Sequence, residues 1–139
     1  MNAVDTNVLI YRLDHKEPAK QARAKVLLQR LRRNRSTTVT IWQVITETAR
    51  WLRAQQLSGH FTSTQVRNYL RGFRQFFPIS MPTQVILDRA LDLADAHSLS
   101  HWDSMLVAAC LEAGVDTLFT EDMGAPRLIE SLRLENPFI

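Results

Sequence analysis

Four carboxylic acids, Asp5, Glu47, Asp103 and Asp122, are the residues of this chain whose types and positions could do chemistry. They are far apart in the sequence, and each lies at an expected element end or on a mostly apolar helix face. A single buried carboxylate is costly to ionise, whereas several carboxylates that converge on divalent cations can stay ionised. The sequence therefore predicts a metal site built from these four acids.

The types of ligand indicate which metal such a site would bind. Hard carboxylate oxygens suit Mg²⁺ or Mn²⁺, and no convincing set of His or Cys residues favours zinc. The single cysteine, Cys110, excludes an internal disulfide and a multi-cysteine zinc site. A bound ion would lower the pKa of a water for attack on phosphorus, and a second ion would stabilise the leaving oxygen.

The charges of the chain are unevenly distributed. Residues 15–74 contain 13 Lys and Arg but only two acids, whereas residues 75–139 contain three Arg and ten acids. A basic surface attracts phosphates overall, although the predicted metal ligands are themselves negative. Arg67, Arg71 and Arg74 form one stripe of an expected helix and are candidate phosphate contacts. A solvated helix face is the alternative interpretation of that stripe.

Length and composition indicate one ordinary globular domain over residues 1–139. The chain is 45% hydrophobic and 22% charged, without a low-complexity tract, linker or repeat. Its longest apolar stretch, Met105 to Leu111, is far shorter than the roughly 20 residues that span a bilayer. The N-terminus lacks the features of a signal peptide. We therefore expect a cytoplasmic protein with no membrane contact.

Hydrophobic periodicity and capping residues predict alternating strands and helices. The expected strands are Met1–Val4, a β-prone Ser36–Thr40, a brief extended Pro78–Pro82 and Asp116–Thr120. The expected helices are Thr6–Leu13, Pro18 to about Arg33, Ile41 to about Gln55, Thr62–Phe77, Thr83 to about His97 and Trp102–Ala113. This order favours an α/β sandwich with a small, mainly parallel sheet.

The expected elements bring the acids toward one edge of that sheet. Asp5 and Asp122 follow strands, and ligands collect at the carboxyl ends of parallel strands. Asp103 begins a nearly all-apolar helix and can point to the same crevice. Glu47 lies beside the apolar side of its helix, near Val44 and Trp51.

Several segments of the chain resemble PIN-domain ribonucleases, and the VapC-type toxins of type II toxin-antitoxin pairs in particular. They cover essentially the whole chain in the order typical of that family. The opening Asp-Thr-Asn and the motif W-D-x-x-x-V-A-A are the most specific of them. The matching segments are Val4–Tyr11, Thr46–Ala49, His101–Ala109 and Leu118–Met123.

The resemblance implies a PIN-like three-layer α/β/α sandwich and a set of site residues. Asp5, Glu47, Asp103 and Asp122 correspond to the acidic quartet of the family, which ligates Mg²⁺ or Mn²⁺ and cleaves RNA. Asp5 and Asp103 are expected to be the principal ligands, and Glu47 and Asp122 further ligands or water-orienting groups. By the same resemblance, Asn7 and Thr120 support the site, and Glu121 is a possible extra ligand.

The resemblance also implies partners. These are an RNA substrate, a cognate VapB-like antitoxin whose C-terminal segment covers the active site, and a second copy of the chain in a homodimer.

Each feature also has an ordinary structural interpretation. Asp5 could be only a helix cap, Glu47 could pair with Arg50, Asp103 could close a capping box, and Asp122 could be a turn residue. The indoles of Trp42, Trp51 and Trp102 are interpreted as packing groups of helices.

Two other functions compete with a nuclease. An aspartyl-phosphate phosphatase or receiver also places an Asp after the first strand, but all three lysines of this chain precede residue 26, so a late phosphate-binding lysine is missing. A non-catalytic RNA-binding module would use the arginines and leave the acids structural. Dependence of cleavage on metal separates that module from a nuclease.

Overall fold

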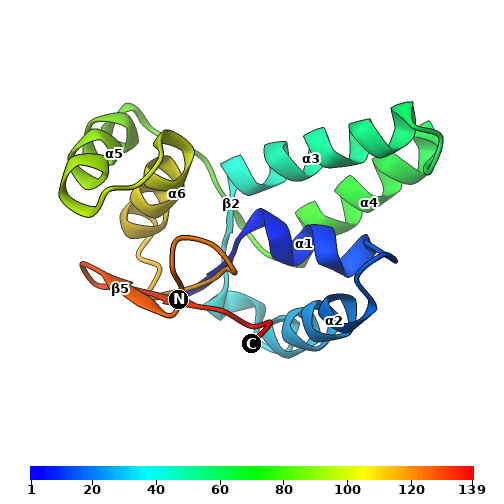
Figure 1. The fold of residues 1–139 in the computed structure, drawn as a ribbon, viewed down its shortest axis with the longest axis horizontal. Helices are drawn as coiled ribbons and strands as arrows, with labels where there is room; N and C mark the ends of the chain where they lie inside the picture. Colours follow the sequence, from blue (N-terminus) through cyan, green and yellow to red (C-terminus); the bar gives the residue numbers. More distant parts are fainter.

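The computed structural model describes all residues 1–139, which form two small sheets surrounded by six helices (Figure 1). The strands are β1 (Asn2–Val4), β2 (Thr40–Ile41), β3 (Ile79–Ser80), β4 (Thr117–Phe119), β5 (Arg127–Ile129) and β6 (Leu132–Glu135). The helices are α1 (Thr6–Leu13), α2 (Pro18–Arg32), α3 (Trp42–Leu57), α4 (Ser63–Phe76), α5 (Gln84–His97) and α6 (His101–Glu112), with a 3₁₀ turn at Arg35–Thr37.

The main sheet has the strand order β1-β4-β6-β5. β1 pairs parallel with β4, β4 pairs parallel with β6, and β5 is the antiparallel edge strand. The short β2 and β3 form a second, parallel pair. A parallel bridge between Asn2 and Thr38, with the Val39 N–H donating to the Asn2 carbonyl at 2.9 Å, joins this pair to β1. Polar Asn2 therefore fits the sheet, because its backbone is paired on both sides.

The helices pack in consecutive pairs around this sheet. In Figure 1, α5 and α6 lie together at one end, α3 and α4 form a long hairpin at the other, and α2 runs beside α1. Local sequence sets where these helices begin. Pro18 begins α2, Thr62 and Gln65 form a reciprocal capping box at α4, and the Ser100 hydroxyl accepts from the third residue of α6.

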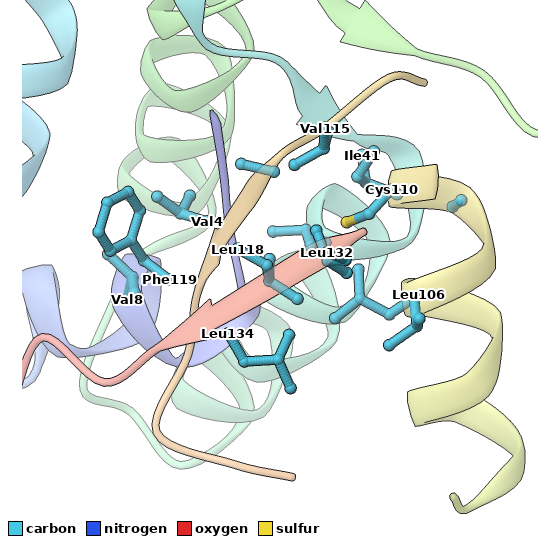
Figure 2. Close-up of a cluster of buried hydrophobic side chains, with 14 of the residues drawn as sticks. Val4, Val8, Ile41, Leu106, Cys110, Val115, Leu118, Phe119, Leu132 and Leu134 are labelled. Atoms are coloured by element: carbon cyan, nitrogen blue, oxygen red, sulfur yellow. The ribbon is translucent and has the colours of Figure 1, made fainter. Parts of the chain in front are cut away.

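The core lies between the strands and the helices. Figure 2 shows side chains of β4 and β6 in the middle, with Val8 of α1 on one side and Leu106 and Cys110 of α6 on the other. Leu118 and Cys110 are fully buried. Helices therefore cover both faces of the sheet, which confirms the predicted sandwich.

The predicted elements are confirmed with boundary shifts of one or two residues, apart from two differences. Ser36–Thr40 is not one strand, because its first residues belong to the 3₁₀ turn and only Thr40 joins β2. The hairpin of β5 and β6 was not predicted. No helix is both long and apolar enough to span a bilayer.

The interpretation of the tryptophans is wrong for one of them. Trp102 is 62% exposed, because it lies in the first turn of α6 before that helix enters the core. Trp42 is half-buried and packs against the core, as predicted.

Candidate functional site

The site begins where two parallel strands end. Val4 of β1 stands opposite Phe119 of β4, so the next residues, Asp5 and Thr120, leave the sheet at the same edge. The Asp5 N–H donates to the Phe119 carbonyl at 2.9 Å, which extends the pairing one step beyond the strand. The predicted convergence of the first acid with the segment after the late strand is therefore present.

Asp5 is 6% exposed, and its carboxylate is fixed at both oxygens. Oδ1 accepts from the Thr6 N–H at 2.6 Å, which makes Asp5 the N-cap of α1. Oδ2 accepts from the Thr120 hydroxyl at 2.7 Å. Thr120 is fully buried, and its oxygen accepts in turn from the Asp122 N–H at 3.0 Å. This threonine therefore joins the first acid to the last.

Burial raises the pKa of Asp5 to about 6. The hydrogen bonds from Thr120 and Thr6 lower that pKa in part, whereas the negative charges of Asp122 and Glu47 raise it further. The folded protein thus places an acid where its ionised form is disfavoured by burial and by two neighbouring carboxylates. A cation bound among these groups would relieve both effects.

Glu47 is held by two donors. Its Oε2 accepts from the Thr6 hydroxyl at 2.7 Å, and its Oε1 accepts from the Gln43 amide at 2.8 Å. Thr6 therefore links two acids, through its N–H to Asp5 and through its hydroxyl to Glu47. Glu47 forms no ion pair with Arg50, so the alternative of a simple surface pair is absent here.

Asp122 is exposed and is oriented by Asn7. The Asn7 amide nitrogen lies 3.2 Å from Asp122 Oδ2 and 3.4 Å from the Thr120 hydroxyl oxygen. The Asn7 Oδ1 atom is buried and has no hydrogen-bond partner. A buried acceptor without a partner is costly, and a metal-bound water is one group that would satisfy it.

Asp103 is not part of the hydrogen-bond network that joins the other three acids. Its N–H donates to the Ser100 hydroxyl at 3.3 Å, and its half-buried carboxylate is in no hydrogen bond or ion pair. The Gln43 amide that holds Glu47 also donates to the Trp102 carbonyl at 3.0 Å. This shared amide places the start of α6 beside Glu47 and leaves the Asp103 carboxylate free.

Glu121 points away from the other acids. Its carboxylate accepts from the Tyr11 hydroxyl at 2.5 Å and pairs with Lys20 at 2.9 Å. Lys20 also lies over the Tyr11 ring, 4.6 Å from its centroid. Of the two consecutive acids after β4, the structure thus turns Asp122 toward Asn7 and Glu121 toward α2. The expected role of Glu121 as an extra ligand remains a prediction.

The donor set fits Mg²⁺ or Mn²⁺ by its chemistry, because it consists of carboxylate and amide oxygens. No three His, Cys, Asp or Glu side chains are grouped closely enough to ligate one ion directly. Mg²⁺ commonly keeps several waters and takes only one or two carboxylates. An ion held partly through water therefore suits this spacing.

Sequence reasoning assigned no role to Thr6, Gln43, Tyr11 or Lys20. Gln43 precedes Glu47 by four residues, and that spacing places two side chains on one helix face. Its bond to the Trp102 carbonyl depends on how α3 meets α6, which no local pattern contains. Tyr11 and Lys20 likewise meet Glu121 only through tertiary packing.

The fold and the site together define a known class of domain. The sequence profile of the PIN domain matches residues 3–129. The chain belongs to the PIN domain family, as its resemblance implied. No curated protein sequence matches it.

The fold is also that of several solved toxin-antitoxin structures. The TM-score is 0.70 to VapBC2 from Rickettsia felis bound to a promoter DNA fragment, at 17% identity over 97% of each chain. It is 0.68 to FitAcB from Neisseria gonorrhoeae, at 18% identity over 99% of each chain. It is 0.61 to the sarcin-ricin-loop-cleaving toxin VapC20 from Mycobacterium tuberculosis, at 17% identity over 96% of this chain and 99% of that one. These identities establish a common fold.

The raised pKa of Asp5 predicts that Asp5→Asn is more stable, relative to the metal-free wild type, at neutral pH than at acidic pH. The pKa of Asp5 is higher in the folded state than in the unfolded state, so folding favours the protonated form. The free energy of unfolding is therefore highest below about pH 4 and falls as the pH rises through about 6. Asparagine retains the cap through its amide oxygen and removes the charge, but its amide nitrogen cannot accept from the Thr120 hydroxyl at either pH. We therefore expect the stability of the variant, relative to wild type in EDTA, to be higher by about 1–3 kcal/mol at pH 7.5 than at pH 4. Urea unfolding at both pH values measures this difference. The same relative stability of Asp5→Asn at both pH values, with exposed Asp88→Asn unchanged, would contradict the prediction.

Proposed function

We propose that this PIN domain is a metal-dependent endoribonuclease and the toxin of a toxin-antitoxin pair. The observation that carries the proposal is the network in which Thr6, Asn7 and Thr120 join Asp5, Glu47 and Asp122 at one sheet edge. That network stands within a PIN domain whose fold is shared with toxin-antitoxin structures. The cleavage of a sarcin-ricin loop by VapC20 supports RNA as the substrate.

In the proposed mechanism, water attacks the phosphorus of an RNA phosphodiester. A bond forms from the water oxygen to phosphorus while the bond from phosphorus to O3′ breaks. Bound Mg²⁺ or Mn²⁺ would neutralise the phosphate charge and lower the pKa of the water. The water loses one proton and O3′ gains one, so the products carry a 5′-phosphate and a 3′-hydroxyl.

The proposed roles of the acids follow from how each is held. Asp5 and Asp103 are the principal metal ligands, since Asp5 is fixed and Asp103 is free to move toward an ion. Glu47 and Asp122 are further ligands or orient the attacking water, because Gln43 and Asn7 hold their carboxylates in place. An aspartyl-phosphate mechanism is disfavoured, because all three lysines of the chain precede residue 26 and the late phosphate-binding lysine of such sites is missing.

Cleavage of RNA tests the enzyme. We expect discrete cuts of total RNA with Mg²⁺ or Mn²⁺, none in EDTA, and new ends with 5′-phosphates. Asp5→Asn and Asp103→Asn should each lower the rate at least about 100-fold, because each removes a charged ligand, and exposed Asp88→Asn should not. End mapping by ligation to the 5′-phosphate measures the products. Equal cleavage in EDTA, or RNA binding without cleavage by the folded protein, would favour a non-catalytic RNA-binding module.

The toxin role is tested in cells. Expression of the chain should arrest growth, and co-expression of the protein encoded by the adjacent gene should relieve that arrest by covering the acidic site. Expression of the Asp5→Asn variant should not arrest growth. The measured quantity is the growth rate after induction. Arrest that no genuine neighbour relieves would contradict the toxin role and leave the nuclease intact.

A homodimer is also proposed, and an apolar surface supports it. A cavity of about 180 Å³ lies between β3, α3 and α6, lined mostly by hydrophobic side chains. Met81 and Trp102 on it are 60% and 62% exposed, and exposed apolar patches commonly mark protein interfaces.

The dimer proposal predicts that Met81→Glu converts the protein from dimer to monomer. Burying a carboxylate in an apolar interface is costly, so the association constant should fall by about 100-fold or more. Sedimentation velocity at tens of micromolar protein measures this fall. Leu128→Glu, on the exposed edge strand β5, is the matched control. A monomeric wild-type protein would count against the proposal.

A further inference from the structure

The helices α3 and α4 enclose a groove whose lining includes none of the four acids. The groove has a volume of about 330 Å³ and is lined by apolar and cationic side chains. α3 contributes Trp42, Ile45 and Ala49 to its lining, and one face of α4 contributes Leu70 with Arg67, Arg71 and Arg74. The three arginines predicted from the sequence as a stripe thus border one groove.

These arginines have no compensating negative charge. None of the three is in an ion pair, and α4 contains no acidic residue. Each guanidinium contacts only a neutral oxygen of its own helix, at distances of 3.3–3.4 Å. Arg89, by contrast, is paired with two glutamates. The Arg67, Arg71 and Arg74 side chains are therefore available for an anionic ligand.

Their spacing suits a linear polyanion. Helical rise places Arg67 about 6 Å from Arg71 along α4, and Arg71 about 4.5 Å from Arg74. Planar guanidinium groups bind phosphates through paired hydrogen bonds. A row of three can therefore contact successive phosphates of one strand.

Trp42 gives the groove a stacking surface. Its indole is half-buried, and no aromatic ring or cation of the protein stacks on it. Unstacked bases of single-stranded RNA pack on such aromatic faces while the backbone follows nearby cations.

The groove also adjoins the acidic site. Trp42 is followed by Gln43, whose amide donates to Glu47, and successive residues of a helix project about 100° apart. The first turn of α3 therefore presents one face to the groove and the next face to the acids. A strand that passes around this turn would reach both.

We propose that the α3–α4 groove binds single-stranded RNA beside the cleavage point, with the three arginines on phosphates and a base on Trp42. The choice of RNA as ligand rests on the proposed ribonuclease function. An acidic polypeptide could use the cations, but it would leave the indole face without a planar partner. RNA is therefore the ligand that the whole groove favours.

The test measures binding without cleavage. Every protein carries Asp5→Asn and is kept in EDTA, and a labelled single-stranded RNA 20-mer is titrated across a salt series. The groove variant adds Arg67→Ala, Arg71→Ala and Arg74→Ala. The matched control adds Lys16→Ala, Lys25→Ala and Arg33→Ala, which removes the same charge from exposed residues that form no ion pair.

We expect the groove variant to bind RNA about 10- to 100-fold more weakly than the control. The slope of log binding constant against log salt concentration should be smaller by about 2 for the groove variant, because each lost phosphate contact contributes about 0.7 for a single strand. Trp42→Leu should weaken binding about tenfold and Trp42→Phe less, since phenylalanine can still stack a base. Thermal melting confirms that each variant is folded.

Three results would overturn the proposal. The first is equal weakening of RNA binding in the groove variant and the control, and the second is unchanged RNA binding in both. The third comes from a parallel titration with polyglutamate, if the groove variant loses polyglutamate binding and retains RNA binding. The last result would assign the groove to an acidic protein. Because the test needs no cleavage, the two proposals can fail separately. If the protein binds RNA in this groove and never cuts it, the proposed nuclease alone is refuted. If the groove variant cuts RNA as fast as wild type, this inference alone is refuted.

Discussion

The parallel pairing of β1 with β4 is the constraint on which the site depends. It brings the ends of two strands from opposite ends of the chain together and lets the buried Thr120 hydroxyl donate to the Asp5 carboxylate. The same pairing buries Asp5 and raises its pKa, so the fold holds an ionised acid at a cost in stability. A ligand that binds only the folded protein offsets such a cost. The burial of Asp5 and the two carboxylates beside it are thus the reason that a cation would stabilise this fold.

The sequence patterns predicted the features that depend on neighbouring residues, such as where helices begin. The helix after Asp5 begins at Thr6 and ends at Leu13 as predicted, because an aspartate after a strand is a strong N-cap. The rule that parallel strands gather ligands at their carboxyl ends placed Asp5 and the segment after β4 together. The family resemblance, carried by motifs at both ends of the chain, is confirmed by the match to the PIN domain.

What the sequence did not predict depends on tertiary geometry. The turn after β4 decides which of two consecutive acids faces the site, and it contains Met123 at a positive φ of 58°. Glu121 consequently meets Lys20, a contact between residues 101 positions apart. Gln43 joins α3 to the start of α6, and its second bond depends on the packing of those helices. Such contacts leave no periodic signal in the sequence.

The site draws its four acids from the beginning, the middle and the end of the chain. Thr120, which ties Asp5 to the segment of Asp122, donates its own N–H to the Glu135 carbonyl after β6. A ribosome must therefore synthesise nearly the whole polypeptide before the acids can assemble. Fragments released early lack β6, and with it the strand that pairs with β4 and the carbonyl that accepts from Thr120. The order of synthesis thus delays the assembly of the candidate site until almost the whole chain has been made.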